Sequence, residues 1–401
     1  MRPTLLLIAC SALLSTLHTS CQMQEREQDP TTTVAYMLNL DQTEEAMLPF
    51  TDMVARIELI QLSDKPLLGA IDKVVARNDK LYVLDKIGNQ VVRYDRSGRF
   101  LGHIGKQGEG PGEYKAVYNM LLPPHSSEVW LLVPWHIQRY DSSGRYISQV
   151  RLAFHPSQIG IRGEEEVCYS TNFYDPTYYT YCQQLNPHQL EPQITDRFFP
   201  YTRAKDLSQL PGITNICGQF VQYYDQLYAN LPGTPLIFRF APQGPPEPFL
   251  LAEGPDIWPY DQREALEQFS QKMQQFEITY LNAYQIVDQQ WGVFKVVRKG
   301  KRRSANYFYF FDTQRLYSSQ KNFQADALRQ AFLANGPRGY TKGGVFFILG
   351  ESLKNNIERT FDELSPLVPE VIPEDVWHKI DERHNNPLVL ALYLKDPKSN
   401  K

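Results

Sequence analysis

Apolar and polar residues alternate in short runs through most of the chain. Residues 81–100 read LYVLDKIGNQVVRYDRSGRF, and residues 129–146 read VWLLVPWHIQRYDSSGRY. Each stretch joins two β-rich runs by a short turn and then continues as Arg-Tyr-Asp-x-Ser-Gly-Arg and an aromatic residue. Alternation with a period of two is typical of strands, and Asp-x-Ser-Gly suits a tight hairpin because glycine accepts a positive φ. The pattern therefore predicts two copies of an antiparallel meander.

Weaker copies of the same turn follow along the chain. The first two intervals between turns are 46 and 45 residues, which fits the roughly 40 to 50 residues of a four-stranded propeller blade. The later intervals of 55, 71 and 84 residues require insertions. We predict an all-β fold, a six-bladed β-propeller with short helical insertions in the later blades; five or seven blades also fit. The turn markers are Asp95, Asp141, Asn186, Ala241, Asp312 and Asp396.

The predicted insertions are helical. Residues 261–276 begin with the capping-box spacing Asp261-Gln-Arg-Glu264 and continue with Leu266, Phe269, Met273 and Phe276 at helical steps. Shorter apolar patterns of the same kind occur later in the chain. They predict further helices at 324–334, 353–361 and 373–382.

A propeller avoids free sheet edges when its ring closes, usually by joining strands from both ends of the chain. The apolar stretch 387–395 is one candidate closing strand. Its partner is expected to be residues 54–62 or residues 33–40.

Residues 1–21 predict a lipoprotein-type signal peptide. A positive start and an apolar run too short to span a membrane lead to Cys21, and a polar stretch follows. Cleavage would leave Cys21 as an acylated N-terminus held on a membrane, although His18 stands where such signals usually carry Leu. Ordinary secretion with cleavage nearby is the alternative. We expect residues 22–50 to form a tether and first strand, and residues 51–401 to form the propeller.

Cysteine spacing leaves one question open. An exported protein can form disulfides, and a hairpin turning about Asp175 would set Cys168 opposite Cys182, within bonding reach. Two buried free thiols are the alternative. No Cys or His spacing typical of a zinc site is present, so no metal ligands are predicted.

Composition and charge exclude several classes. A net charge of −4 with 42% hydrophobic residues is not that of a disordered polyelectrolyte or of a basic nucleic-acid-binding protein. The 24 Tyr, 21 Phe and 5 Trp residues support a large β protein, because aromatic residues are enriched in strands.

The sequence resembles the six-bladed β-propeller lipoproteins of Bacteroides-type bacteria, which are distantly similar to NHL-repeat propellers. The resemblance covers roughly residues 50–396 and is most specific in the first two predicted blades. It implies a propeller exported to the periplasm or the outer surface, without a settled activity. The segments that carry it are Ile57–Leu62, Leu68–Val74, Leu81–Asp85, Gly105–Tyr114 and Asn386–Leu390.

Several aromatic residues are candidate ligand contacts, since aromatic rings can stack on sugars. Trp135 and His136 occupy the turn where the first copy has Gly-Asn, and Tyr174, Tyr178 and Tyr179 lie in or beside the predicted Cys168–Cys182 hairpin. Packing between blades is the alternative for all five.

Charged and glycine-rich clusters receive structural interpretations. Gly105, Gly108, Gly110 and Gly112 lack the context of a phosphate loop and predict a connection between blades, pinned by Glu113 or Tyr114. A basic run predicts a solvated hairpin turn, with contact to an anionic glycan or lipid headgroup as the alternative. It comprises Lys295, Arg298, Lys299, Lys301, Arg302 and Arg303.

Five carboxylates could face a central channel, although turn capping is the preferred interpretation. No Gly-x-Ser-x-Gly elbow and no repeated acidic or His motif occurs, so no catalytic residues are predicted. The five are Asp85, Glu113, Asp141, Asp288 and Glu351.

The sequence therefore predicts a monomeric binding or scaffolding module at the cell envelope. Its partner would be an envelope protein, a peptide or a glycan, with a lipid anchor in the outer or inner membrane facing the periplasm or the cell surface. No nucleic-acid partner and no cofactor are expected. The alternatives are a propeller enzyme (a Ca²⁺-dependent lactonase, lyase or glycan hydrolase) and an accessory protein of polysaccharide utilisation.

Overall fold

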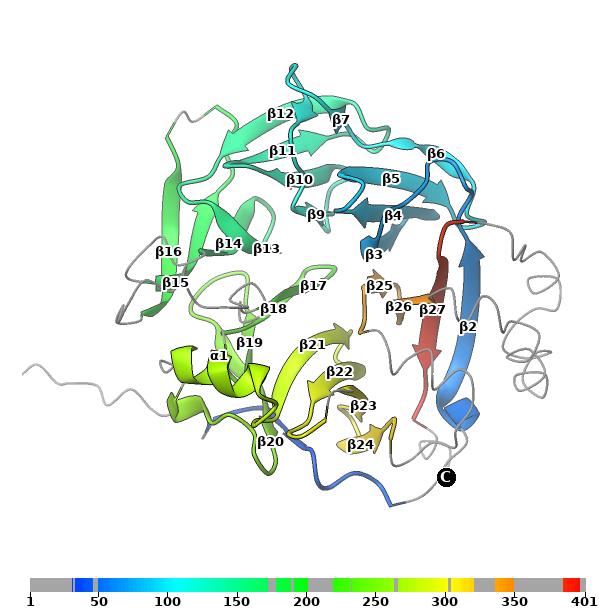
Figure 1. The fold of residues 1–401 in the computed structure, drawn as a ribbon. Coiled ribbons are helices and arrows are strands. Elements are labelled where there is room, and N and C mark those ends of the chain that lie inside the picture. The colour runs from blue at the N-terminus through cyan, green and yellow to red at the C-terminus, as the bar shows by residue number, and fades with distance from the viewer. Residues whose placement is uncertain are drawn as a thin grey trace, which may run out of the picture.

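The chain forms β-sheets set around a ring in a propeller-like arrangement (Figure 1). The prediction of an all-β fold is confirmed. The computed structural model describes residues 31, 33–45, 50–171, 178–188, 191–200, 219–231, 233–262, 266–301, 304–320, 336–349 and 385–396.

Four sheets contain the antiparallel meander of consecutive strands that forms a propeller blade. The first contains β9 (Asn119–Leu121), β10 (Val129–Val133), β11 (His136–Tyr140) and β12 (Tyr146–Arg151). The second contains β13 (Pro156–Arg162), β14 (Glu166–Thr171), β15 (Tyr178–Gln184) and β16 (Gln193–Pro200). The third contains β17 (Phe220–Tyr223), β18 (Gln226–Asn230), β19 (Leu236–Phe240) and β20 (Glu247–Glu253). The fourth contains β21 (Tyr280–Val287), β22 (Trp291–Val297), β23 (Ser304–Phe310) and β24 (Arg315–Ser318).

The remaining large sheet has eight strands, in the order β2-β27-β26-β25-β3-β4-β5-β6. At its middle, β25 and β3 run parallel and pair only through Gly339 with Val74 and Tyr340 with Val75. Its strands are β2 (Val54–Gln61), β3 (Ile71–Arg77), β4 (Lys80–Asp85), β5 (Gln90–Asp95), β6 (Phe100–His103), β25 (Gly339–Thr341), β26 (Gly344–Leu349) and β27 (Leu388–Leu394).

Strands from both ends of the chain meet in this sheet. β27 pairs with β2 in antiparallel register, from Val54 opposite Leu394 to Gln61 opposite Leu388, and pairs with β26 on its other side. The first of the two expected closing pairs is therefore present. The other N-terminal candidate contains β1 (Tyr36–Asn39), which instead adds to the outer edge of β20 in parallel. A 3-10 turn, η2 (Phe50–Met53), leads into β2.

The two strongest copies of the sequence repeat form equivalent turns. Oδ1 of Asp95 accepts hydrogen bonds from the N–H groups of Ser97 and Arg99, and Oδ1 of Asp141 accepts the same bonds from Ser143 and Arg145. The six turn markers lie at the ends of β5, β11, β15, β19, β23 and β27, in chain order. Asp95 is the last residue of β5, and each of the others follows its strand by one or two residues.

The glycine of each strong copy contacts the strand beside its turn. Gly98 has a φ of +83°, and a Cβ there would lie 1.9 Å from the carbonyl oxygen of Gln61. Gly144 has a φ of +90°, and its Cβ would lie 2.2 Å from the carbonyl oxygen of His103. Glycine is thus required both by the backbone conformation and by the close approach to the neighbouring strand.

The glycine-rich segment after β6 connects two sheets, as predicted. Glu113 pins it, because its carboxylate accepts the N–H of Gly110 and pairs with Lys106 at 2.7 Å. Two short strands, β7 (Lys106–Gln107) and β8 (Glu113–Tyr114), pair in parallel within this segment.

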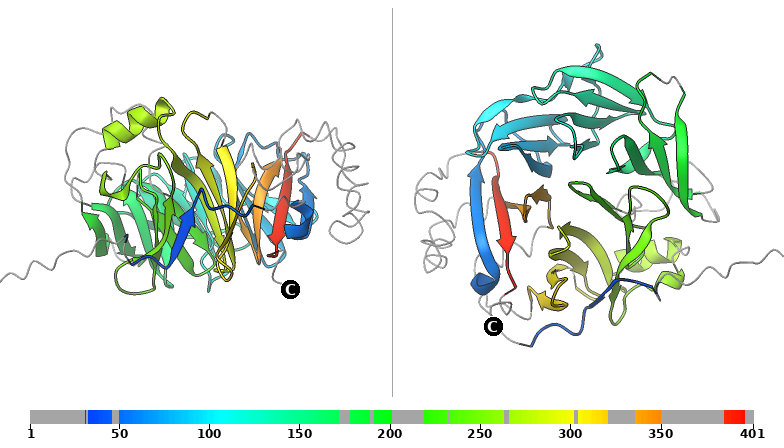
Figure 2. Two further views of the ribbon diagram at one scale, coloured as in Figure 1. Left: turned by 90° about the horizontal axis from the view of Figure 1, so that it is seen from below. Right: turned by 180° about the vertical axis from the view of Figure 1, so that it is seen from behind.

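One predicted helix is present among the described residues. η5 (Tyr260–Gln262) and α1 (Leu266–Gln274) occupy the connection between β20 and β21, and Phe269 packs against Trp258 with ring centroids 5.7 Å apart. Figure 2 (left) shows α1 standing above one face of the ring, at its rim. The helices predicted at 324–334, 353–361 and 373–382 lie outside the described residues.

Aromatic side chains fill much of the space between and within the sheets, which supports the packing interpretation of their abundance. The largest fully buried side chains among the described residues are all aromatic: Trp291, Tyr82, Tyr94, Tyr140, Tyr169, Tyr181, Tyr228, Tyr309, Tyr317, Phe249 and Phe294.

Candidate functional site

Six strands lie nearest the centre of the ring: β3, β9, β13, β17, β21 and β25 (Figure 1). A cavity of about 240 Å³ lies among them, lined by residues of all six strands or the segments beside them. Most of its lining comes from the beginnings of these strands, as with Asn119, the first residue of β9. We call this side of the ring the start face. The connection that carries α1 leads into β21 on the same face.

Lys73, on β3, is the most enclosed cation of the cavity. Its Nζ donates hydrogen bonds to Oδ1 of Asn119 at 3.2 Å and to the carbonyl oxygen of Met120 at 2.9 Å. Burial, and then the neighbouring ammonium of Lys86, lower the pKa of Lys73 to about 8. Both effects act against the charged form of this side chain.

Two further cations line the cavity. Lys86 follows β4, Arg338 precedes β25, and both are exposed to solvent. Arg338 also contributes, after burial, to lowering the pKa of the nearby Lys295. The side of the cavity formed by β3, β4 and β25 is therefore rich in positive charge.

Negative charge in the cavity is scarce. Among the described lining residues, Asp72 is the single carboxylate, and its Oδ2 accepts the backbone N–H of Lys86 at 2.9 Å. Within the described part of the chain, no ion pair joins Lys73, Lys86 or Arg338 to a carboxylate. The cavity therefore carries a local excess of positive charge.

Amide side chains from β13, β17 and β21 line the opposite side. Gln222 accepts the N–H of Ile161 at 2.8 Å and donates to the carbonyl oxygen of Tyr224 at 2.7 Å. Gln285 donates to the carbonyl oxygen of Gln222 at 3.4 Å. These glutamines join neighbouring innermost strands and form a fixed polar wall.

Three aromatic rings form a surface patch beside the cavity. Tyr118 directly precedes Asn119 of the cavity wall, and its ring meets His155 edge-on at 5.4 Å. His155 in turn meets Trp135 edge-on at 5.5 Å. Tyr118 is 36% exposed and Trp135 is 48% exposed, so both rings are open to solvent. We call these three residues the aromatic patch.

The other predicted contact residues do not join this patch. His136 begins β11, and its Nδ1 lies 3.1 Å from the carbonyl oxygen of Pro134. Tyr178 is half-buried with its ring edge-on to Tyr181, and Tyr179 is buried among core residues. The packing interpretation is therefore favoured for these two tyrosines. Tyr174 lies outside the described residues.

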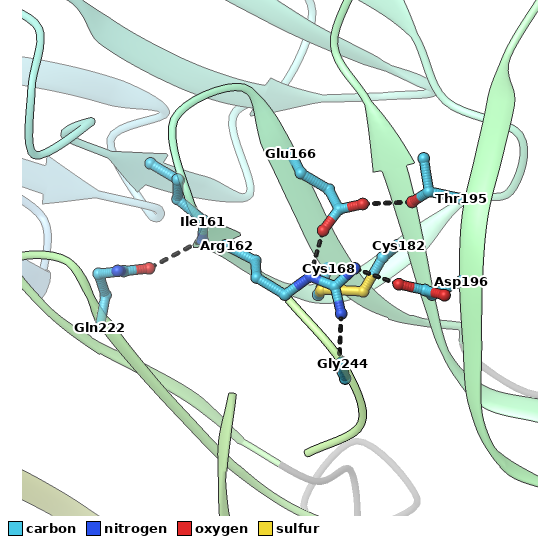
Figure 3. The surroundings of a disulfide bond; sticks show 9 residues. All are labelled: Ile161, Arg162, Glu166, Cys168, Cys182, Thr195, Asp196, Gln222 and Gly244. Carbon is cyan, nitrogen blue, oxygen red and sulfur yellow. Dashed lines mark hydrogen bonds and ion pairs between the residues drawn. A yellow bond between two sulfur atoms is a disulfide. The ribbon is translucent and has the colours of Figure 1, made fainter. Parts of the chain in front are cut away.

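Cys168 and Cys182 are joined by a disulfide bond (Figure 3). They lie directly opposite each other on β14 and β15, in the register that the sequence suggests. In the described part of the chain, these two cysteines and Glu166 form the only group of His, Cys, Asp or Glu side chains close enough together to hold a metal ion. Two of the three donor atoms of this group are the disulfide-bonded sulfurs. This cluster is structural.

A buried arginine lies beside the disulfide. Arg162, at the end of β13, contacts the carboxylates of Glu166 and Asp196 and donates to the carbonyl oxygen of Gly244 at 3.2 Å (Figure 3). Its position at the far end of an innermost strand separates it from the start-face cavity, and its charge is already compensated.

The predicted basic run has structural roles where it is described. Arg298 donates to the carbonyl oxygen of Leu40 and to the hydroxyl of Tyr307, and Lys299 pairs with Asp256 at 2.7 Å. The bond from Arg298 to Leu40 holds the segment after β1 against the hairpin of β22 and β23, and Lys299 holds the segment after β20. Arg302 and Arg303 lie outside the described residues.

The carboxylates considered for the channel also act elsewhere. Glu113 and Asp141 cap turns through the hydrogen bonds described above. Asp85 does the same through four hydrogen bonds that its carboxylate accepts. Asp288 is exposed in the turn after β21. Cys21 and Glu351 lie outside the described residues.

Sequence reasoning did not identify Lys73, Lys86 or Arg338. One signal was available in the first two repeats, because Lys73 and Asn119 each lie 22 residues before their turn aspartate and are hydrogen-bonded in the structure. Insertions erase this spacing in the later sheets.

Fold and site together define an all-β protein of propeller-like architecture with a polar, cation-bearing cavity at its centre. Residues 36–391 match the family model described as Domain of unknown function (DUF4934). The chain belongs to that family. A search of curated proteins finds no match to the sequence.

Two solved structures share the fold. A candidate exported protein of Bacteroides fragilis is 13% identical, with a TM-score of 0.65 over 91% of this chain and 100% of the other. A DUF4221 family member from Bacteroides vulgatus is 11% identical, with a TM-score of 0.50 over 85% of this chain and 98% of the other. At these identities the likeness shows the fold alone. In the described residues, no helix is long and apolar enough to cross a membrane.

Proposed function

We propose that this protein is an exported, six-bladed propeller that acts as a binding module at the cell envelope, with the start-face cavity as its ligand site. The observation that carries the proposal is the cavity itself. Polar side chains from strands all around the ring line it, and three of its cations have no carboxylate partner among the described residues. Rigid scaffolds commonly place binding groups at such convergent points.

The six-blade count follows from dividing the eight-stranded sheet between β25 and β3. These strands share only two residue pairs, whereas each half is otherwise a four-stranded antiparallel sheet. The division gives β3 to β6 as one blade and β25, β26, β27 and β2 as another. The six turn markers, each at the end of a third strand, support the same count.

The lining of the cavity favours binding over catalysis. A glycoside hydrolase of the common type needs two carboxylates, and the described lining contains Asp72 alone. Amide oxygens from Asn119 and the glutamines could contribute to a Ca²⁺ site. However, Lys73, Lys86 and Arg338 would repel a dication at the same place. These charges weigh against the lactonase and lyase alternatives.

An accessory role in polysaccharide binding remains the second candidate, and the aromatic patch favours it. Tyr118 and Trp135 present exposed rings beside the cavity, and aromatic rings offer apolar area with a polar edge for sugar contacts. In this role a glycan would lie across the patch with one end at the cavity.

Export and lipidation complete the proposal. The similarity of fold to a candidate exported protein supports export, and the apolar run before Cys21 supports acylation at that residue. We expect Cys21→Ser to move the protein from the membrane fraction to the soluble fraction in cells, because the acyl chains supply the membrane affinity. Membrane association that persists in the Cys21→Ser variant would count against an anchor at this residue.

A cavity-filling substitution tests the ligand site. Ala283, on β21, lines the cavity and is half-buried, so Ala283→Trp should block it. We expect some members of a library of small metabolites and oligosaccharides to raise the melting temperature of the purified protein but not that of the variant. A ligand at 100 times its Kd stabilises by about 2.7 kcal/mol.

Two results would contradict the proposed ligand site or the proposed binding role. If no compound distinguishes the wild-type protein from Ala283→Trp, the cavity is not a ligand site. If a stabilising compound is converted to a product, detected by mass spectrometry, the protein is an enzyme rather than a binding module.

A further inference from the structure

The distribution of charge in the cavity points to the chemistry of its ligand. Three cationic side chains converge from β3, the end of β4 and the start of β25, while the described lining holds one carboxylate. Each of these cations lacks an ion-pair partner among the described residues, and for the enclosed Lys73 an uncompensated charge is costly. A ligand that supplies negative charge would remove that cost.

We propose that the cavity binds the anionic group of a small ligand, a carboxylate or a phosphate, between Lys73, Lys86 and Arg338. This inference rests on the proposed function, because it names the ligand class of the same site. The cavity volume of about 240 Å³ lies near the lower end for ligand pockets, which begin at about 300 Å³. The enclosed part of the ligand is therefore of the size of a single sugar or a small organic acid.

Lys73 is positioned to donate to such a group. An ammonium has three N–H donors, and two of those of Lys73 are directed to Asn119 and Met120. These two bonds fix the nitrogen against β9, so the remaining donor has a defined direction. A preorganised cation of this kind needs little reordering when the anion arrives.

Lys86 and Arg338 complete the site from the solvent side. Both are exposed, so they can attract an anion before it enters. The carboxylate of Asp72 accepts the N–H of Lys86, which holds it on the backbone of that turn. Arg338 offers the planar pair of donors that suits a carboxylate or phosphate.

The site predicts a specific pH dependence. Lys73 lines the cavity together with the charged groups of Lys86, Arg338 and Asp72 and the rings of Tyr340 and Tyr284. Burial raises the pKa of both tyrosines, so they stay neutral through the range of interest. Because the pKa of Lys73 is about 8, its charge is present below that pH and is lost above it. The affinity for a carboxylate, whose own charge does not change over this range, should therefore fall as the pH rises from 6.5 to 9.5, by about tenfold or more.

The test is calorimetric titration of the purified protein with D-glucuronate, inorganic phosphate and the neutral D-glucose, at pH 6.5 and 9.5. We expect at least one anion to bind at pH 6.5 at least tenfold more tightly than glucose. Lys73→Met should lower that affinity at least tenfold and, for glucuronate, abolish its change with pH. The substitution removes a poorly solvated charge and keeps the aliphatic stem, so the variant should fold.

Lys342→Met is the matched control. Lys342 is an exposed cation in the turn after β25, at the opposite end of that innermost strand, and its loss should leave the affinity unchanged. Preference for glucuronate or for phosphate then identifies which anionic group the cavity takes.

Three results would overturn the inference. They are equal binding of glucose and the anions, anion binding that Lys73→Met does not weaken, and failure of both anions to bind. If compounds from the library still bind in a manner that Ala283→Trp blocks, the binding module stands and only the anionic class is wrong. If none does, the proposed function fails as well.

Discussion

A chain that ends at Pro387 should fail to fold. The truncation removes β27, whose seven residues are all buried and which pairs with β2 on one side and β26 on the other. Burial of a large apolar side chain contributes about 1.5–3 kcal/mol, so the loss of Leu388, Leu390, Leu392 and their neighbours is comparable with a total stability of about 5–15 kcal/mol. β2 would also lose the one strand with which it pairs among the described residues.

Circular dichroism in the near ultraviolet and size-exclusion chromatography would measure this loss. A chain that ends at Asp396 is the control, because it keeps β27 and the bonds of Asp396 to Thr313 and Arg315. Cooperative unfolding of the truncated chain at a midpoint near that of the control would show that the ring does not depend on β27.

Asp85→Ala should destabilise the protein by about 3 kcal/mol or more. Asp85 is fully buried, and its carboxylate accepts the backbone N–H groups of Gly69, Ala70 and Gly88 at 2.8–3.0 Å, as well as Nε2 of Gln90 at 3.1 Å. Removing it leaves three backbone donors without this acceptor, each at a cost of about 1–3 kcal/mol. Urea denaturation provides the measurement.

The exposed Asp225 provides the control, since Asp225→Ala should change stability by less than about 0.5 kcal/mol. Asp85→Asn is the second variant to measure if Asp85→Ala does not fold. Its amide keeps one acceptor oxygen but turns an NH₂ group towards two of the donors, so it should cost about half as much. An Asp85→Asn variant as stable as the wild type would refute this role of the carboxylate.

The stabilisation that Asp85 provides should depend on pH. Burial alone would raise the pKa of Asp85, but the hydrogen bonds from Gly88, Ala70, Gly69 and Gln90 outweigh it and hold the pKa below its ordinary value. The stabilisation is therefore present at neutral pH and is lost as the pH falls below about 4, through the lowered pKa. The difference in stability between the wild type and Asp85→Asn should shrink over that range.

The fold could be predicted largely because its repeat is local. Asp95 and Asp141 form their turns through bonds to residues two and four positions away, so the sequence alone contains the whole motif. The closing strand was predictable for a similar reason, since an apolar stretch such as 388–394 must be buried on both faces. The choice of its partner was not, because both N-terminal candidates have the same strand-like pattern, and each pairs with a different sheet.

The cavity was harder to predict because it is assembled from single residues of many strands. Lys73 and Arg338 are 265 positions apart in sequence, and no local pattern links the two. Trp135, expected to be exposed at a turn, is 48% exposed in the turn between β10 and β11. Tyr179 is buried, because five consecutive residues of β15 are buried and the strand packs on both faces. The two residues differ because Trp135 lies in a turn, whereas Tyr179 lies in a strand covered on both sides.

The N-terminal segment has a consequence for how the molecule comes apart. β1 lies on the edge of β20, Glu44 bonds to Leu316 of β24 through its N–H, and β2 pairs with β27. The N-terminal segment thus bonds to three consecutive sheets at their outer edges. Loss of the pairing between β2 and β27 would not by itself separate the sheets, because β1 would remain paired with β20. We therefore expect a raised barrier to unfolding, so the lifetime of the folded protein would depend on the rate of unfolding as much as on equilibrium stability.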